Sequence, residues 1–277
     1  MGGGVFTKEE FQENLGSPFT NSLVERLRRF AHIPHALLDQ LAHDALAEIW
    51  GINNFGLEKY LSVHVPWSLE QGLFTQSENQ FYVSAGHLQT RYGTPLYLVF
   101  ERNRDAGRQP FYLRFVGSQV SASELPVPPV IPSPPELPRG AEVIMMHDHI
   151  LGDQADRVEF LRTAPPVAQM CAVSGAIQWS LNRNLHLPYW YFGRMNYLVP
   201  LYLQSRENIT LAPDLVAPIQ VNPDSLLVRT VLEPHMPYAN ARVAVRRHDQ
   251  LPPWLLDGWT DYSRGATEAQ IEDPEAG

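Results

Sequence analysis

The chain has 277 residues, of which 44% are hydrophobic, and its formal net charge is −9. This length can bury a sizeable core in one or two domains, whereas the acidic balance argues against a protein that coats nucleic acid through a broad basic face. No apolar run approaches the roughly 20 residues of a membrane-spanning helix, and the N-terminus lacks the pattern of a secretory signal. The single cysteine, Cys171, fits a reducing compartment, so we expect a cytoplasmic protein with no membrane partner.

The N-terminal part of the sequence predicts helices followed by a small hairpin. Thr7 and Glu10 form a capping box at the start of a short helix, and Ser22 with Glu25 forms a second box. Apolar residues at helical spacing predict two longer helices, the second of which Pro66 is expected to bend or break. We place these helices at residues 7–16, from residue 22 onward, and at residues 34–50 and 57–70. The hairpin is placed at residues 72–83. Helices followed by a hairpin are typical of a winged-helix-like module.

From about Leu88 the pattern changes to short runs of aliphatic, β-branched and aromatic residues, which predict strands. We place the strands at residues 96–100, 111–116, 143–146, 195–203 and 226–232. Helices are predicted at residues 165–182 and 237–245. The proline-rich residues 125–138 predict an extended polyproline-type loop, either a spacer or a docking site for a proline-reading domain.

These elements predict an α+β protein in four parts. An N-terminal segment, 1–19, precedes the winged-helix-like part, 20–86. A mixed, mainly antiparallel sheet with packed helices follows over residues 87–257 and includes the proline-rich loop, 121–139. The acidic C-terminal residues 258–277 are expected to be disordered.

Four arginines crowd the predicted turn between two strands. They are Arg102, Arg104, Arg108 and Arg114. Their charges repel one another unless an anion lies among them, and a guanidinium group matches two oxygens of a phosphate or carboxylate at once. We therefore expect Arg102, Arg104 and Arg108 to bind an anionic ligand, with Asn103 and Gln109 adding neutral hydrogen bonds. The alternative is that the arginines are solvated or pair with carboxylates of the protein itself.

Two other segments carry candidate chemistry. In the sequence His147-Asp148-His149, no third metal ligand follows at a diagnostic spacing, so we predict no metal site and take His149 as a proton-transfer candidate. The aromatic run of residues 188–192, just before Arg194, could stack a nucleobase, although a core cluster would give the same pattern.

Three blocks resemble a bacterial family of domains of unknown function, the one numbered thirty-eight twenty-five. The most specific block covers residues 95–113; the second contains Asp148-His149-Ile150 with Arg157, and the third is Tyr238-Ala-Asn-Ala-Arg242. Relatives in that family are often joined to small RNA-binding modules, so the resemblance implies work on RNA or nucleotides. It also adds Arg157, Asn240 and Arg242 to the expected ligand site.

The leading hypothesis is an arginine-lined pocket for RNA or a nucleotide-like small molecule, with phosphoryl-transfer or hydrolytic chemistry left open. The second is a stand-alone biosynthetic enzyme that acts on a small organic acid or nucleoside-like metabolite. The third is a protein-interaction module that docks through the N-terminal helices or the proline-rich loop. No cofactor is indicated by the sequence, and the oligomeric state is left open.

Overall fold

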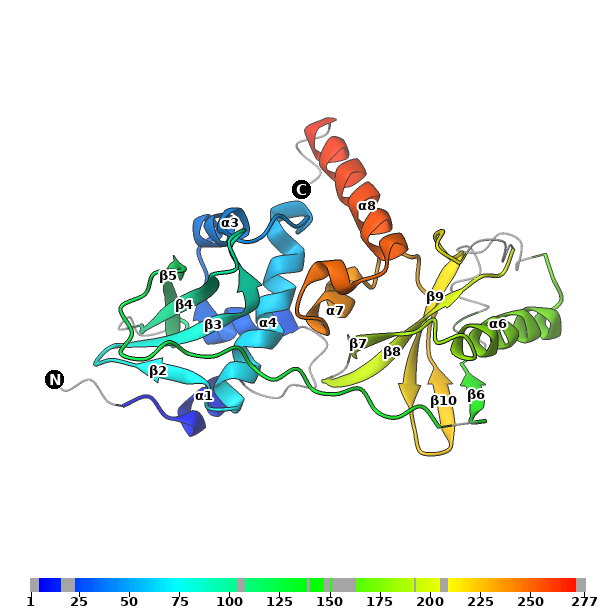
Figure 1. The fold of residues 1–277 in the computed structure, drawn as a ribbon, viewed down its shortest axis with the longest axis horizontal. Coiled ribbons are helices and arrows are strands. Elements are labelled where there is room, and N and C mark those ends of the chain that lie inside the picture. Colours follow the sequence, from blue (N-terminus) through cyan, green and yellow to red (C-terminus); the bar gives the residue numbers. More distant parts are fainter. Residues whose placement is uncertain are drawn as a thin grey trace. The chain divides into compact units, whose positions relative to one another are not determined.

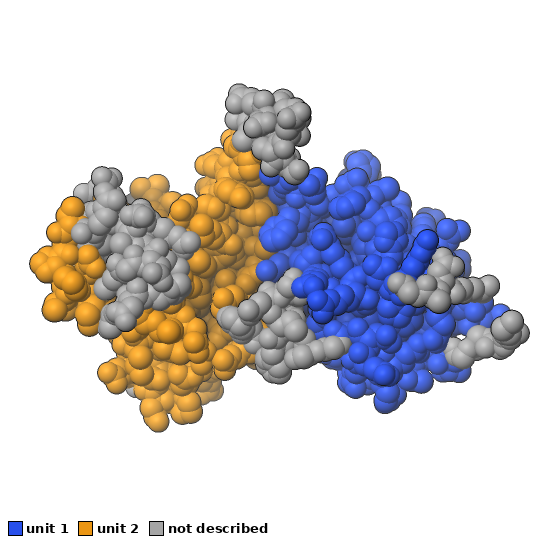
Figure 2. All heavy atoms as spheres, turned by 180° about the vertical axis from the view of Figure 1, so that it is seen from behind, with its two compact units in different colours: residues 1–131, 246–248 blue, residues 132–245, 249–277 orange. Residues whose placement is uncertain are grey.

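The computed structural model describes residues 5–15, 23–103, 108–138, 140–146, 150, 163–191, 193–204 and 209–272. The chain divides into two compact units, shown in different colours in Figure 2. Unit 1 comprises residues 1–131 with 246–248, and unit 2 comprises residues 132–245 with 249–277. Each unit contains a five-stranded sheet and helices, which confirms the α+β class. None of the helices in the described ranges has the length and apolarity that crossing a membrane requires.

Unit 1 contains four α-helices among its described residues and one sheet (Figure 1). Its elements are α1 (Lys8–Leu15), α2 (Leu23–Phe30), β1 (Ala31–His32), α3 (His35–Asp44), the 3-10 turn Ile52–Asn54, α4 (Phe55–Glu70), β2 (Phe74–Gln76), β3 (Gln80–Gln89), β4 (Pro95–Arg102) and β5 (Phe111–Gly117). The strand order is β1-β5-β4-β3-β2, with only the β1–β5 pair parallel. Contrary to the expected break, α4 continues through Pro66, because burial on nearly all sides holds it in place.

An aromatic core joins the helices of unit 1 to one face of its sheet. Seven phenylalanine rings form neighbouring pairs with centroids 4.7–6.3 Å apart, a spacing that favours edge-to-face and offset contacts. They are Phe6, Phe11, Phe30, Phe74, Phe81, Phe100 and Phe111. Because α1 and α2 supply two of these rings, the N-terminal helices are part of the sheet unit.

Unit 2 contains the second sheet, with helices on both faces (Figure 1). Its elements are β6 (Glu142–Met145), α6 (Pro166–Leu181), β7 (Leu187–Tyr191), β8 (Arg194–Leu201), β9 (Leu215–Val221), β10 (Ser225–Val228), α7 (Tyr238–Val243) and α8 (Pro253–Glu272). A 3-10 turn, His248–Gln250, precedes α8. The strand order is β6-β10-β9-β8-β7, and only the β6–β10 pair is parallel.

Alternate residues of the second sheet pack against different helices. Val199 on β8 and Ala217 on β9 pack with α6, whereas Leu198 and Val216, one position earlier on each strand, pack with α7 and α8. This alternation follows from the two-residue period of a strand. The face toward α7 and α8 also includes Gln220 and Leu227, which are register partners on β9 and β10.

Side-chain hydrogen bonds hold the backbone of the proline-rich loop. In its first half, Gln71 bonds both the N–H and the C=O of Val130, at 2.8 and 2.9 Å. In its second half, the hydroxyl of Tyr197 donates to the carbonyl oxygen of Pro135 at 2.8 Å. Val127, Val130, Ser133 and Glu136 are exposed while Pro126 and Pro129 are buried, which is the three-residue period of polyproline II.

The division of the chain differs from the one expected from composition. The expected boundary between residues 86 and 87 falls inside β3, a continuous strand in the middle of the first sheet, and the units divide instead after residue 131. Helix α8 extends to Glu272 and so covers most of the segment expected to be disordered, because Trp254, Leu255 and Trp259 anchor it in the core of unit 2. The winged-helix-like arrangement remains a prediction.

Candidate functional site

Arg102, the first residue of the predicted arginine cluster, is engaged by the protein itself. Both terminal nitrogens of its guanidinium group bond the carboxylate of Glu10 on α1, one of them at 3.0 Å. The guanidinium carbon also lies 4.7 Å from the centre of the Phe6 ring, a cation–π distance. For this residue the structure agrees with the alternative interpretation, pairing with an internal carboxylate, although the side chain stays 41% exposed.

The rest of the predicted cluster is divided between exposed positions and backbone structure. The Asn103 N–H donates to the carbonyl oxygen of Pro110 at 2.8 Å and closes the hairpin. Arg108 is exposed and Gln109 is half-buried, whereas Arg104 lies outside the described residues. The neighbouring Glu101 accepts hydrogen bonds from Gln80 and Tyr112.

The candidates from the closing block have structural contacts in unit 2. Arg242 is only 2% exposed, and its Nη1 donates to the carbonyl oxygen of Val245 at 3.1 Å, so it closes the end of its own helix, α7. The Asn240 Nδ2 donates to the hydroxyl of Tyr189 at 3.3 Å, and burial raises the pKa of that tyrosine. His149 and Arg157 lie outside the described residues.

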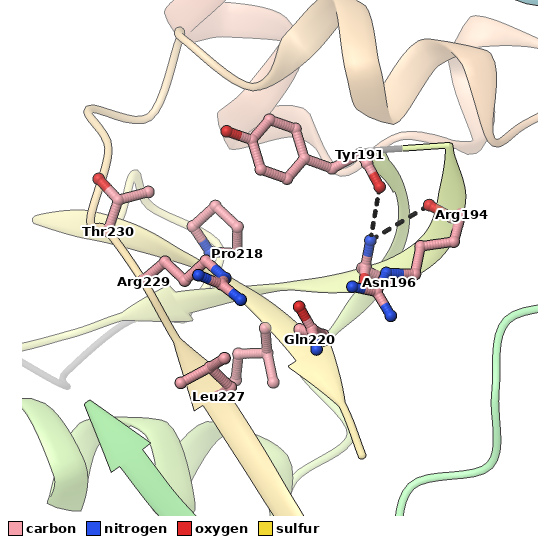
Figure 3. Close-up of a pocket in the computed structure, with 9 residues that line it drawn as sticks. Tyr191, Arg194, Asn196, Pro218, Gln220, Leu227, Arg229 and Thr230 are labelled. Atoms are coloured by element: carbon pink, nitrogen blue, oxygen red, sulfur yellow. Dashed lines mark hydrogen bonds between the residues drawn. The ribbon is translucent and has the colours of Figure 1, made fainter. Parts of the chain in front are cut away.

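The structure brings a different set of polar residues together, in a pocket on the second sheet (Figure 3). It encloses about 350 Å³ of space that opens to solvent. The lining residues come from β7 to β10 and the residues just after β10: Tyr191, Arg194, Asn196, Pro218, Ile219, Gln220, Leu227, Arg229 and Thr230. Most of them lie on the sheet face that α7 and α8 cover in part, so the pocket occupies the uncovered part of that face.

Two arginines at this pocket have no carboxylate partner among the described residues. Arg194 begins β8 and Arg229 directly follows β10, and both side chains are exposed. The contact of the Arg229 guanidinium is a weak one, 4.0 Å from Nη1 to the sulfur of Met146. Figure 3 shows both guanidinium groups over the same sheet face. β9 lies between their strands, and the register places Arg229 level with Leu198, four residues along β8 from Arg194, so the two backbones are roughly 16 Å apart and only the long side chains can approach one ligand.

Asn196 fixes the backbone from which Arg194 projects. It is 4% exposed, and its Nδ2 donates to the carbonyl oxygens of Tyr191 at 3.0 Å and Arg194 at 3.1 Å (Figure 3). Gly193 takes a φ of 70° in the same turn, a value that suits glycine. The β7–β8 turn is therefore held by a buried amide, which orients Tyr191 and Arg194 together.

The sequence indicated part of this pocket. The aromatic run before Arg194 was a candidate for base stacking, and the structure places Tyr191 and Arg194 at the same pocket. Gln220 and Arg229 were not predicted as site residues. In the sequence each is a single polar residue in or beside the apolar run of β9 or β10, which gives no signal of a binding site. Sequence alone does not reveal that β9 and β10 pair beside β8.

The pocket combines cations with neutral hydrogen-bonding groups over an apolar floor. Gln220, whose Nε2 donates to Asn222 Oδ1 at 2.9 Å, lies between the strands of the two arginines. Pro218 and Leu227 supply the apolar floor. Within the described ranges, no group of three histidine, cysteine, aspartate or glutamate residues is placed to hold a metal ion. The arrangement is therefore suited to binding an anion by charge and hydrogen bonds.

No protein-family model matches this sequence, and no curated protein or solved structure is significantly similar to it. The family resemblance therefore stays a prediction, and a function for this chain has to be inferred from its own geometry.

Proposed function

We propose that this protein binds a phosphate-bearing ligand, a nucleotide or RNA, in the pocket between Arg194 and Arg229. The observation that carries the proposal is the pair of exposed arginines over one sheet face without a carboxylate partner among the described residues. This keeps the leading hypothesis from the sequence and moves its centre from the arginine hairpin to the second sheet.

The charge of the chain supports a local site. With a net charge of −9, two arginines of one pocket that lack a carboxylate partner in the described part of the chain stand out against an acidic background. Each guanidinium group can donate two parallel hydrogen bonds to phosphate oxygens, and such charge-assisted bonds contribute about 1.5–3 kcal/mol each. A phosphate group between the side chains of Arg194 and Arg229 would relieve their mutual repulsion. The amide of Gln220, on the strand between them, could donate to or accept from the same ligand.

A small organic acid is the second candidate, because carboxylates fit guanidinium groups as phosphates do. The pocket is small and open to solvent, which favours this alternative over a large polymer. Both candidate ligands would be bound by Arg194 and Arg229. They differ in whether the anionic group is a phosphate or a carboxylate. Whether a reaction follows binding depends on residues such as His149, whose role as a proton-transfer group remains a prediction.

Calorimetric titration of the full chain with nucleoside monophosphates, inorganic phosphate and succinate tests the proposal. We expect saturable binding of the phosphate compounds and weaker binding of succinate. Arg194→Ala and Arg229→Ala should each weaken binding by roughly 10- to 100-fold. Arg183→Ala is the matched control, because Arg183 is an exposed arginine of the same unit that stacks on Trp179, 4.2 Å from its ring centre.

Binding that survives the Arg194→Ala, Arg229→Ala double substitution would overturn the proposal. If Arg108→Ala abolished binding instead, the site would lie in the arginine hairpin of unit 1. A preference for succinate over every phosphate compound would favour the organic-acid candidate.

A further inference from the structure

We infer that the ligand of this pocket carries a planar aromatic base beside its phosphate, and that it is a free mononucleotide, with the base against Tyr191. This inference rests on the proposed function, because it names the ligand class for the same site. It depends on the apolar part of the pocket, which an inorganic phosphate or a sugar phosphate would leave uncovered.

The floor of the pocket offers a flat apolar surface next to the cations. Pro218 on β9 and Leu227 on β10 line the floor, and the backbone between them is a regular antiparallel pair. Leu227 is only half-buried and Tyr191 is 37% exposed, so apolar surface here still faces water. Covering it with a planar ring would be favourable in proportion to the area removed from water. A phosphate alone gains nothing from this surface.

Tyr191 is positioned to act as a stacking platform. It is paired in register with Arg194 across the β7–β8 turn, so the two side chains leave adjacent strands on the same face of the sheet. The ring of Tyr189 lies 5.9 Å behind it at an angle of 31°, and the hydroxyl of Tyr189 is in turn held by Asn240. A ring that is supported in this way loses little freedom when a base stacks on it.

The surroundings of the pocket favour a mononucleotide over a nucleic-acid strand. A strand that ran across the sheet toward β6 would meet Glu142 and Ile144, which share the face of Leu227 through the parallel β6–β10 register. Both are exposed, one is anionic and the other apolar. In the other direction, the face of β7 is covered by α7. The described residues therefore provide cations for one phosphate group and no basic track for a chain of them.

The experiment compares probes that add one part of a nucleotide at a time. Inorganic phosphate, ribose 5-phosphate, the monophosphates AMP, GMP, CMP and UMP, and a 5′-phosphorylated RNA hexamer are titrated into the full chain by calorimetry. We expect at least one monophosphate to bind roughly 5- to 100-fold more tightly than ribose 5-phosphate. The hexamer should bind no more tightly than the best monophosphate.

Tyrosine variants assign this gain to the ring. Tyr191→Ala should reduce monophosphate affinity to that of ribose 5-phosphate and leave ribose 5-phosphate binding unchanged, whereas Tyr191→Phe should retain the gain. Tyr92→Ala is the control, because Tyr92 is a more exposed tyrosine in unit 1. A thermal melt of each variant shows that it is folded before affinities are compared.

The outcomes separate the two proposals. If no phosphate compound binds, the proposed function itself fails. If ribose 5-phosphate binds as tightly as every monophosphate and Tyr191→Ala has no effect, the phosphate site stands and the base is excluded. If the hexamer binds far more tightly, with affinity that falls steeply as salt rises, the ligand is RNA and the mononucleotide assignment is overturned.

Discussion

The guanidinium group of Arg102 lies against the carboxylate of Glu10, 92 residues earlier in the chain. This pair ties the end of β4 to the N-terminal helix α1 and places Arg102 over the ring of Phe6. The contact explains how one member of a crowded arginine segment is accommodated without a ligand. It also shows that α1 is fastened to the sheet of unit 1 by charge as well as by its phenylalanine.

Arg102→Ala should lower stability slightly and leave ligand affinity unchanged. The pair is partly exposed, so we expect a loss of about 0.5–1 kcal/mol in the free energy of unfolding. Urea unfolding of Arg102→Ala, Glu10→Ala and the double variant measures the coupling between the two side chains. A double variant no less stable than either single one would confirm the pair, whereas a tenfold loss of nucleotide affinity in Arg102→Ala would return this residue to the ligand site.

Gly86→Ala should destabilise unit 1 strongly. Gly86 has a φ of 62°, and an added Cβ would lie 2.5 Å from the hydroxyl oxygen of Tyr60 and 2.9 Å from Cγ of His64, both in the fully buried part of α4. Backbone strain and overpacking each cost about 1–3 kcal/mol, so we expect a loss of roughly 2–5 kcal/mol by urea unfolding.

Gly72→Ala is the control for this prediction. Gly72 has a similar φ of 73°, but nothing lies within 4 Å of an added Cβ. Gly72→Ala should therefore lower the free energy of unfolding only through backbone strain, by about 1–2 kcal/mol. Equal losses for both substitutions would mean that the crowding around Tyr60 and His64 is relieved by small movements.

Local patterns in the sequence predicted the helices of unit 1 and the strands with uninterrupted apolar runs. Of the capping box at Thr7, for example, one half is present, since the Glu10 N–H donates to the Thr7 hydroxyl at 3.2 Å, whereas the Glu10 carboxylate bonds Arg102. Strands β7 and β9 were not predicted, because Pro188 and Pro218 interrupt runs that otherwise have strand composition. Both strands are stabilised by pairing on either side of β8, a long-range contact that local patterns do not contain.

The candidate site was predicted less well than the fold. The density of arginines around Arg104 marked a hairpin, but one of its arginines is satisfied by Glu10, which is remote in sequence. Arg194 and Arg229 are isolated in the sequence and meet only because β8, β9 and β10 are neighbours in the sheet. Charge density along the chain predicts an anionic ligand, which stays a prediction, and strand order determines which cations share a pocket.

Gln71→Ala should release the proline-rich loop from unit 1. The Gln71 amide makes both hydrogen bonds that Val130 can offer, and His87 lies 3.0 Å from the carbonyl oxygen of Pro129. Losing the two exposed bonds of Gln71 should cost about 0.5–1.5 kcal/mol and make residues 125–131 more sensitive to proteolysis. Limited digestion followed by mass spectrometry locates the new cleavage sites.

The same loop bears on the interaction-module hypothesis. Domains that recognise proline-rich segments bind exposed prolines. Pro126 and Pro129 are buried against the protein and so are not accessible to such a domain. A panel of proline-reading domains should therefore bind Gln71→Ala more tightly than the unaltered chain. Tight binding to the unaltered chain would instead favour an exposed docking function for this loop.

His186 should make unit 2 less stable in acid. Its Nδ1 is buried without a hydrogen-bond partner among the residues that the structure describes, its ring meets Tyr197 edge-on at 4.9 Å, and burial lowers the pKa of the imidazole below its ordinary value of 6.5. The folded state thus binds fewer protons than the unfolded state once the pH falls below about 6.5. Unit 2 therefore has its full folding stability, as far as His186 is concerned, above about pH 6.5, and loses stability as the pH falls below that value.

His186→Phe removes the titrating group and keeps an aromatic ring against Tyr197. We expect the variant to lose less stability than the unaltered chain between pH 7 and pH 5, as measured by urea unfolding at each pH. His43→Phe, at an exposed position on α3 in unit 1, controls for the effect of the substitution itself. His235, whose pKa is also lowered, mainly by burial, would account for the remaining acid sensitivity. An identical pH dependence in His186→Phe and the unaltered chain would show that the folded and unfolded states protonate His186 alike, so that burial does not lower its pKa.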